Sequence, residues 1–160
     1  MNTRKMRKYG VISLAVISLI IAGRILFEPY RISGDCMEPT IKNAQLTFLN
    51  RISSYLRHYQ IGDIIVFNHE GKEWISRIVA LANNSIQITE GRVIVNGAAL
   101  DDKKLHRNWS GWKRGIYAFD NPLQVPAGHV FVLFDNLSAE HDDSRVFGPI
   151  SNSSILGLIW

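Results

Sequence analysis

A second cysteine is what the 160-residue sequence most clearly lacks, because its single cysteine, Cys36, cannot form a disulfide bond within the chain. Cysteine content therefore does not indicate the redox compartment of the protein, and one thiol is left free. A lone cysteine is often a small buried hydrophobic residue. The neighbours of Cys36, which are Gly34-Asp35 before it and Met37-Glu38 after it, are unusual for a core position and favour a functional role.

Acidic residues are missing from the first eight positions, which contain Arg4, Lys5, Arg7 and Lys8. These four residues account for the entire formal net charge of +4, so the rest of the chain is neutral overall. A nucleic-acid-binding protein needs clustered positive charge on its folded domain. We therefore expect no nucleic-acid partner.

Internal repeats and low-complexity tracts are also absent from the sequence. A content of 46% hydrophobic and 20% charged residues excludes wholesale disorder. A chain of 160 residues is long enough for one domain with one hydrophobic core.

The basic start of the chain is followed by an apolar run from Tyr9 to Gly23, then by Arg24 and three more apolar residues. A helix rises about 1.5 Å per residue, so residues 9–27 would extend about 28 Å and cross a bilayer if Arg24 reached the far interface. Basic residues before the span place residues 1–8 in the cytoplasm. The sequence thus predicts a membrane anchor over 9–27 and an extracytoplasmic domain over 28–160. Such a chain is a single-pass protein of the cell membrane, and membrane lipid is one of its expected partners.

A cleavable secretory signal is the alternative interpretation of the same run. Its uninterrupted apolar part is short, and Ala22-Gly23 are small enough for a processing site. Both interpretations predict that the folded part is exported.

The chain beyond residue 44 has the pattern of an antiparallel β protein. Short apolar or alternating runs recur with turn residues between them, notably at Glu90-Gly91 and Asn96-Gly97. The strands expected are 45–50, 62–67, 74–81, 85–89, 92–96, 130–134 and 155–160, with a helical turn within 51–60 and a long polar and aromatic excursion over 101–124. This spacing predicts a mostly β fold, namely a folded-over antiparallel or barrel-like sheet.

The segment around Cys36 has the character of an exposed, rigid turn. Ser33, Gly34 and Asp35 favour an irregular backbone, and Pro39 fixes its own φ and biases Glu38 toward extended conformations. With residues 27–31 before it, the stretch 32–41 resembles the Ser-Met-x-Pro-Thr nucleophile box of type I signal peptidases, which cut signal peptides from exported proteins. Cys36 occupies the position of the family's serine.

The resemblance covers nearly the whole chain and includes four more boxes in the family's order. They are Ile61-Gly62-Asp63-Ile64-Ile65-Val66-Phe67, Trp74-Ile75-Ser76-Arg77-Ile78-Val79-Ala80, Glu90-Gly91-Arg92-Val93-Ile94-Val95-Asn96-Gly97, and Asp135-Asn136 followed by Asp143-Ser144-Arg145. The resemblance implies the signal peptidase fold and a groove for extended signal-peptide or pilin-like precursor segments. It implies no metal and no cofactor.

Both positions of the family's catalytic pair are changed, according to this resemblance. The family uses a serine whose proton is removed by a lysine of lowered pKa. Here Cys36 occupies the nucleophile position and Ser76 the general-base position. Lys72 is the nearest lysine, but four strand residues correspond to about 13 Å, so it replaces the base only with a bulge or register shift.

A cysteine depends less on a base than a serine does, because about 3% of a free thiol is ionised at pH 7. His141, aligned backward from Asp143, matches a family position next to the lysine, although the segment 136–143 is one residue longer than usual. His141 is thus either an alternative base or a solvated loop histidine. The other four histidines, His58, His69, His106 and His129, have no motif context and are interpreted as surface or structural residues.

The remaining matched positions imply scaffold and groove roles. Arg77, Asp143 and Arg145 match residues that tie the base strand to the last box by ion pairs. Gly34 matches a position that contributes to the oxyanion hole, where only backbone N–H groups are available here. Gly34, Met37 and Pro39 are the substrate-binding candidates.

Two functions follow from this pattern. In the first, the protein is a non-catalytic or degenerate signal peptidase homologue that binds precursor segments by β-strand addition. In the second, it is an active peptidase with Cys36 as nucleophile. Ser76 favours the first function, whereas a cysteine in place of an inert residue at position 36 favours the second.

Overall fold

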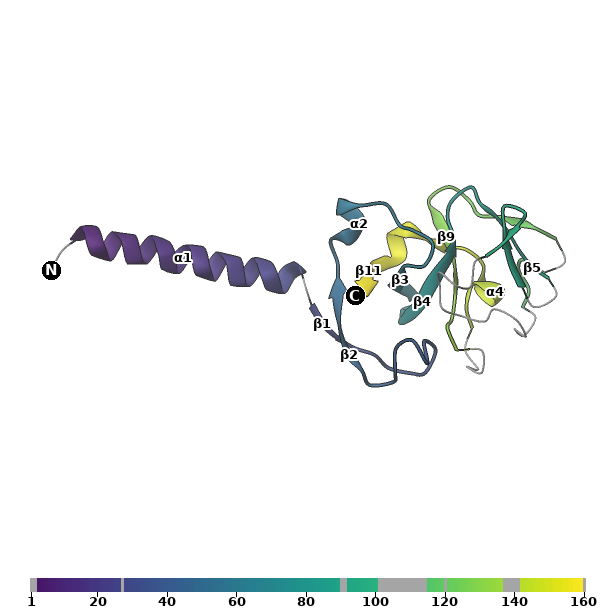
Figure 1. Ribbon diagram of the computed structural model, residues 1–160, viewed down its shortest axis with the longest axis horizontal. Coiled ribbons are helices and arrows are strands. Elements are labelled where there is room, and N and C mark those ends of the chain that lie inside the picture. Colours follow the sequence, from purple (N-terminus) through teal and green to yellow (C-terminus); the bar gives the residue numbers. More distant parts are fainter. Residues whose placement is uncertain are drawn as a thin grey trace.

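The computed structural model describes residues 3–26, 28–89, 92–100, 115–119, 121–136 and 142–159. Helix α1 (Thr3–Leu26) projects from a β domain formed by the later residues (Figure 1). The strands are β1 (Glu28–Arg31), β2 (Leu46–Asn50), β3 (Ile64–His69), β4 (Lys72–Ala80), β5 (Ser85–Thr89), β6 (Arg92–Val95), β7 (Ala98–Ala99), β8 (Leu123–Gln124), β9 (His129–Leu133), β10 (Ile150–Ser151) and β11 (Ile155–Ile159). The short helices are α2 (Ser53–Leu56), α4 (Ser144–Phe147) and the 3₁₀ turn η1 (Asn152–Ser154).

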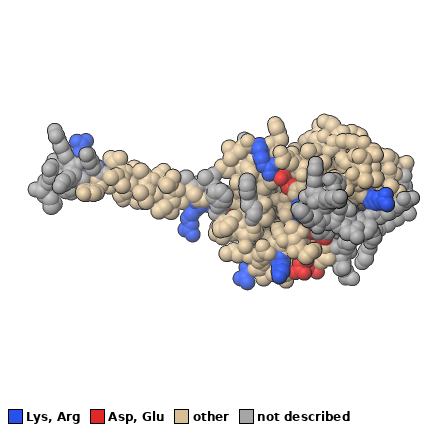
Figure 2. Space-filling model, in the orientation of Figure 1, with Lys and Arg blue, Asp and Glu red and all other residues tan. Residues whose placement is uncertain are grey.

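Helix α1 contains no acidic residue in its first turn and has Arg24 in its last turn, where a cation favours the helix C-terminus. The middle of α1 shows no charged side chain on the face seen in Figure 2. No helix in the described part of the chain is both long enough and apolar enough to cross a membrane. The membrane-spanning helix expected over residues 9–27 is therefore not supported.

The strands form two antiparallel sheets. The larger has seven strands in the order β1-β2-β11-β3-β4-β9-β10, and the smaller has four in the order β7-β6-β5-β8. Among the described strands neither sheet closes on itself, so the mostly β antiparallel class is confirmed but a closed barrel is not formed. The sequence located β5 at its bounds and β2, β3, β4, β6, β9 and β11 within a few residues, whereas it missed β1, β7, β8 and β10. Most of the expected excursion over 101–124, namely 101–114 and 120, lies outside the described residues.

Strand β4 organises the core because both of its faces are buried. Ile75 packs in a cluster with Ile32 and Met37, whereas Ile78 belongs to a second cluster and Val79 to a third that joins the two sheets. Successive strand residues point to opposite faces, so one strand supplies side chains to all three clusters. The cluster around Ile75 holds the segment that follows β1 against the large sheet.

In the large sheet, the backbone of β11 passes very close to the backbone of β2. The β3–β11 register shifts between Ile155 and Gly157, which marks a bulge in β11. A Cβ atom at Gly157 would lie 2.7 Å from the carbonyl oxygen of Asn50. Glycine is therefore required where β11 passes β2, and β11 pairs with β2 on one side and with β3 on the other.

Candidate functional site

Cys36 lies in a turn between β1 and β2. The Asp35 carbonyl accepts a hydrogen bond from Glu38 N at 3.0 Å, and the Met37 carbonyl accepts one from Ile41 N at 2.9 Å. The Met37 side chain is 1% exposed and packs in the cluster around Ile75. Met37 thus anchors the turn in the core, and its burial leaves Cys36 at the surface of that core.

Two asparagines hold this turn from either side. Asn136 donates its backbone N–H to the Cys36 carbonyl at 2.8 Å and its Nδ2 to the Asp35 carbonyl at 3.0 Å. Asn43 accepts a hydrogen bond from Gly34 N through Oδ1 at 3.1 Å. Gly34 has a φ of 100°, and a Cβ built there would lie 3.7 Å from the Cys36 Sγ. A side chain at position 34 would be strained because of this positive φ, although its Cβ would make only an ordinary contact with the thiol.

A buried ion pair connects the turn to β4 and to the end of β9. Arg77 donates to both carboxylate oxygens of Asp135, at 2.9 Å and 2.6 Å, and Nη1 donates to the Gly62 carbonyl at 2.7 Å. The Asp135 carboxylate also accepts a hydrogen bond from the Thr40 hydroxyl. Bidentate pairing of this kind is short, directional and strong. It fixes three distant segments of the chain relative to one another.

The ion pairs differ in their partners from what the resemblance implied. Arg77 pairs with Asp135, which the sequence singled out only as part of a motif. Asp143 pairs instead with Arg145 two residues away, at 2.7 Å, and caps α4 by accepting from Arg145 N. Asp143 also accepts from Phe134 N at 3.2 Å, so this second pair supports the end of β9.

A cavity of about 600 Å³ opens beside the turn. One wall comes from β1 and the turn, and the other from β4; the lining residues are Tyr30, Arg31, Ser33, Gly34, Cys36, Lys72, Glu73, Trp74 and Ile75. The Tyr30 hydroxyl donates to Glu73 Oε2 at 2.9 Å, although β1 and β4 are not neighbours in the sheet. The sheet thus folds over so that its first strand faces β4 across the cavity.

Two titratable groups on the cavity wall have raised pKa values. Burial, followed by the hydrogen bond to Glu73, raises the pKa of Tyr30 to about 12. Burial also raises the pKa of the Cys36 thiol, and the Asp35 carboxylate adds to this effect. The backbone N–H of Cys36 itself acts in the opposite direction and favours the thiolate. Cys36 is 8% exposed, and its thiol is mainly protonated at neutral pH.

Ser76 does not line this cavity. It is fully buried on the β4 face that also carries Trp74 and Ile78, and it pairs with Ile65 of β3. Within the described residues its hydroxyl has no hydrogen-bond partner. Lys72, by contrast, lines the same cavity as Cys36. His141 lies outside the described residues.

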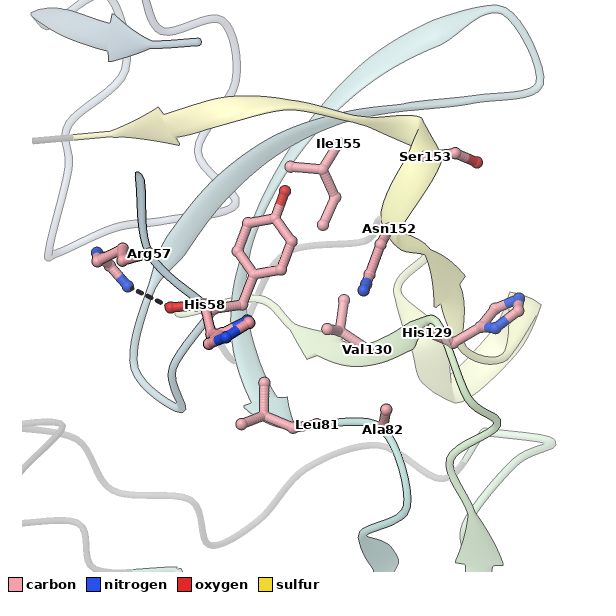
Figure 3. Close-up of a pocket in the computed structure, with 10 residues that line it drawn as sticks. Arg57, His58, Leu81, Ala82, His129, Val130, Asn152, Ser153 and Ile155 are labelled. Atoms are coloured by element: carbon pink, nitrogen blue, oxygen red, sulfur yellow. Dashed lines mark hydrogen bonds between the residues drawn. The ribbon is translucent and has the colours of Figure 1, made fainter. Parts of the chain in front are cut away.

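A second cavity, of about 550 Å³, contains none of the predicted site residues (Figure 3). His58 and His129 lie on opposite sides of it, with Leu81 and Val130 between them. His129 Nδ1 lies 3.0 Å from the Ala127 carbonyl, and the Arg57 guanidinium beside His58 is paired with Asp63 at 2.8 Å. Across the described residues no group of three or more His, Cys, Asp or Glu side chains is arranged to hold a metal ion.

Comparison with known families matches nearly the whole chain, including the Cys36 turn, to one family. The family described as signal peptidase, peptidase S26, matches residues 5–159 of the chain. The chain belongs to this family. Signal peptidase I of Bacillus amyloliquefaciens is 28% identical over 149 residues, which cover 91% of this chain and 80% of that protein. Signal peptidase I S of Bacillus subtilis (strain 168) is 28% identical over 152 residues, which cover 91% and 82% of the two chains.

A solved signal peptidase structure shares the fold. The crystal structure of a signal peptidase I from Enterococcus faecalis V583 superposes with a TM-score of 0.50 and 25% sequence identity, and covers 65% of this chain and 98% of that one. The family expected from the sequence is thereby confirmed. Membership of the signal peptidase family implies substrates that bear signal peptides.

Proposed function

We propose that this signal peptidase homologue binds an extended precursor segment in the cavity beside Cys36 and does not cleave it efficiently. The observation that carries the proposal is the state of Ser76, which is fully buried and outside the cavity. A serine hydroxyl has no basic form at neutral pH, so position 76 provides no general base. Cleavage needs a base or an already ionised nucleophile.

The state of Cys36 supports the same conclusion. Burial and the Asp35 carboxylate both raise its pKa, so the reactive thiolate is disfavoured. The thiol nevertheless lines an open cavity, where it can contact a bound peptide.

The geometry of β1 suits an extended ligand. It is the first strand of the large sheet, and among the described strands only β2 pairs with it. Tyr30 and Arg31 of β1 line the cavity, so a peptide added along the free edge would pass Gly34 and the thiol. Pro39 is exposed on the same turn, whereas Met37 supports it from the core. Signal-peptide segments and pilin-like segments are the ligands that we propose for this edge.

A second candidate function is peptide cleavage with Cys36 as the nucleophile. This function is favoured by the backbone N–H of Cys36, which stabilises the thiolate form of a side chain that lines the cavity. In this alternative the Sγ attacks the scissile carbonyl, its proton passes through water or His141 to the departing amine as the C–N bond breaks, and water then hydrolyses the thioester and frees Cys36.

Localisation is part of the proposal. The four basic residues at the start of α1 favour a cytoplasmic N-terminus, and α1 projects from the β domain (Figure 1). We propose that α1 associates with the lipid of the cell membrane and that residues 28–160 lie on its extracytoplasmic side.

The test is to measure binding and cleavage of a purified signal-peptide precursor by the full chain. We expect binding without cleavage, and a Ser33→Trp variant, which fills the cavity, should weaken binding at least about tenfold, or about 1.4 kcal/mol. Ser153→Trp is the matched control because Ser153 is an exposed residue of the second cavity. Equal binding by the two variants would contradict the proposed site. Cleavage by the wild type that is lost in Cys36→Ala would establish the peptidase alternative.

A further inference from the structure

Asn136 contacts the Cys36 turn from a distant part of the chain. It lies three residues beyond β9, yet it bonds to two successive carbonyl groups, those of Asp35 and Cys36, at 3.0 Å and 2.8 Å. Its Nδ2 also lies 3.4 Å from Asp35 Oδ2. Both peptide groups that flank the Cys36 Cα are thus held by one residue.

We propose that Asn136 is a positioning residue: by binding the Asp35 and Cys36 carbonyls, it fixes the direction in which the backbone N–H groups of Cys36 and Met37 point. The inference deepens the proposed function, since it concerns the group that faces the bound peptide. It assigns to Asn136 no contact with the peptide itself.

The argument rests on peptide geometry. The two peptide bonds flanking Cys36 are trans, so the carbonyl and the N–H of each planar unit point in opposite directions. With both carbonyls directed at Asn136, the N–H groups of Cys36 and Met37 point away from it. Successive N–H groups on one side of the chain form a concave site that attracts negative charge. Such a site suits either a thiolate or the carbonyl oxygen of a bound peptide.

The pKa of the Cys36 thiol depends on the direction in which these N–H groups point. The Cys36 N–H lowers the pKa of the thiol and so favours the thiolate. The other charged and titratable groups on the cavity are Asp35, which disfavours the thiolate, and Tyr30, Arg31, Lys72 and Glu73 on the walls. Among these side chains, Asp35 is the one that Asn136 contacts in the hydrogen bonds described above.

The Asp35 carbonyl shows why a side-chain donor is needed. It already accepts the Glu38 N–H that closes the turn, and Asn136 Nδ2 uses its second lone pair. The turn bond alone permits the Asp35–Cys36 peptide plane to rotate, and the second donor restricts that rotation. Asn136→Ala removes this donor but keeps the backbone bond to the Cys36 carbonyl.

The experiment measures the pH dependence of Cys36 alkylation by iodoacetamide in the wild type, Asn136→Ala and Asn68→Ala. Asn68 is the matched control because it caps the β3–β4 turn through Gly71 N and touches no part of the Cys36 turn. We expect Asn136→Ala to shift the alkylation midpoint upward and to slow the reaction at pH 8 by about fivefold, while the melting temperature and the rate at high pH stay close to wild type. Asn68→Ala should leave the profile unchanged.

The proposal is overturned if folded Asn136→Ala keeps the wild-type midpoint, or if Asn68→Ala shifts it equally. A faster reaction at every pH would show that Asn136 only shields the thiol, and would also overturn it. If Asn136→Ala does not fold, Asn136→Gln retains an amide donor on a longer side chain and should give a smaller upward shift, whereas an unchanged midpoint in that variant counts against the proposal.

Alkylation requires neither a peptide nor catalysis, so this result is independent of the proposed function. A protein that fails to bind any precursor but shows the expected shift would retain the role of Asn136 and lose the proposed ligand. A protein that binds the precursor but whose Asn136→Ala variant keeps the wild-type alkylation midpoint would retain the proposed ligand and lose the role of Asn136.

Discussion

The buried pair Arg77–Asp135 makes the sharpest quantitative prediction. Asp135→Ala removes the carboxylate that binds Arg77 at two points and accepts the Thr40 hydroxyl. The Arg77 side chain is only 9% exposed, so water cannot replace the lost partner. Removing one member of a buried pair costs about 3–5 kcal/mol because the other charge stays buried and uncompensated. This is a large share of the about 5–15 kcal/mol that stabilises a typical domain.

Urea unfolding followed by circular dichroism measures the effect. With a slope of about 2 kcal/mol per molar urea, the midpoint of Asp135→Ala should fall by about 2 M. Glu28→Ala is the control, since its salt bridge to Arg51 has side chains 45% and 41% exposed. An exposed pair contributes at most about 1 kcal/mol, so this midpoint should fall by no more than about 0.5 M.

The reasoning is refuted if Asp135→Ala and Glu28→Ala lose the same stability. A double replacement, Arg77→Met with Asp135→Leu, separates the cost of an orphaned charge from that of altered packing. It should recover much of the stability lost in Asp135→Ala, because two apolar side chains leave no buried charge.

Three further predictions address the cavity, the topology and the catalytic pair. Tyr30→Phe should lower the free energy of unfolding by about 1 kcal/mol at neutral pH, because the hydrogen bond to Glu73 is lost. The folded-state pKa of Tyr30 is raised from 10.0 to about 12, so wild-type stability should fall as pH rises through that interval. The fall should be smaller in Tyr30→Phe. A membrane-impermeant maleimide applied to intact cells should label Cys36, and labelling that appears only after lysis, with a reactive denatured control, would contradict an extracytoplasmic domain. Cys36→Ser combined with Ser76→Lys should cleave a precursor faster than either single variant, because nucleophile and base act as a unit; a folded double variant without activity would show that the cavity has also diverged.

Local pattern was sufficient to predict the strands with clear alternation. Strand β5 was located at its bounds because Ile86 and Ile88 alternate with polar residues and turn residues follow them. Strand β1 was missed because it has only four residues, one of them Pro29, and becomes a strand by pairing with β2 across the whole Cys36 segment. Pairing of this kind depends on partners that a local window does not contain.

The same limit applies to the site. The motifs placed Asp135 and Asn136 near the family's last box, but the partners of these residues lie far away in the sequence: Arg77 is 58 positions from Asp135, and Asp35 is 101 positions from Asn136. No spacing rule connects residues so far apart. Only the fold shows that Asp135 holds β4 and that Asn136 holds the turn.

Lys72 shows how the fold changes a conclusion drawn along one strand. Its separation from Ser76, about 13 Å by strand geometry, made it a substitute at the base position only with a bulge or register shift. The large sheet folds over, however, and the Tyr30–Glu73 hydrogen bond brings β1 to the end of β4 where Lys72 lies. Lys72 and Cys36 consequently line one cavity while Ser76 is buried outside it. Distance along β4 from the expected base position therefore does not measure proximity to the thiol, and the proposed peptide ligand would meet the positive charges of Lys72 and Arg31 on the cavity walls.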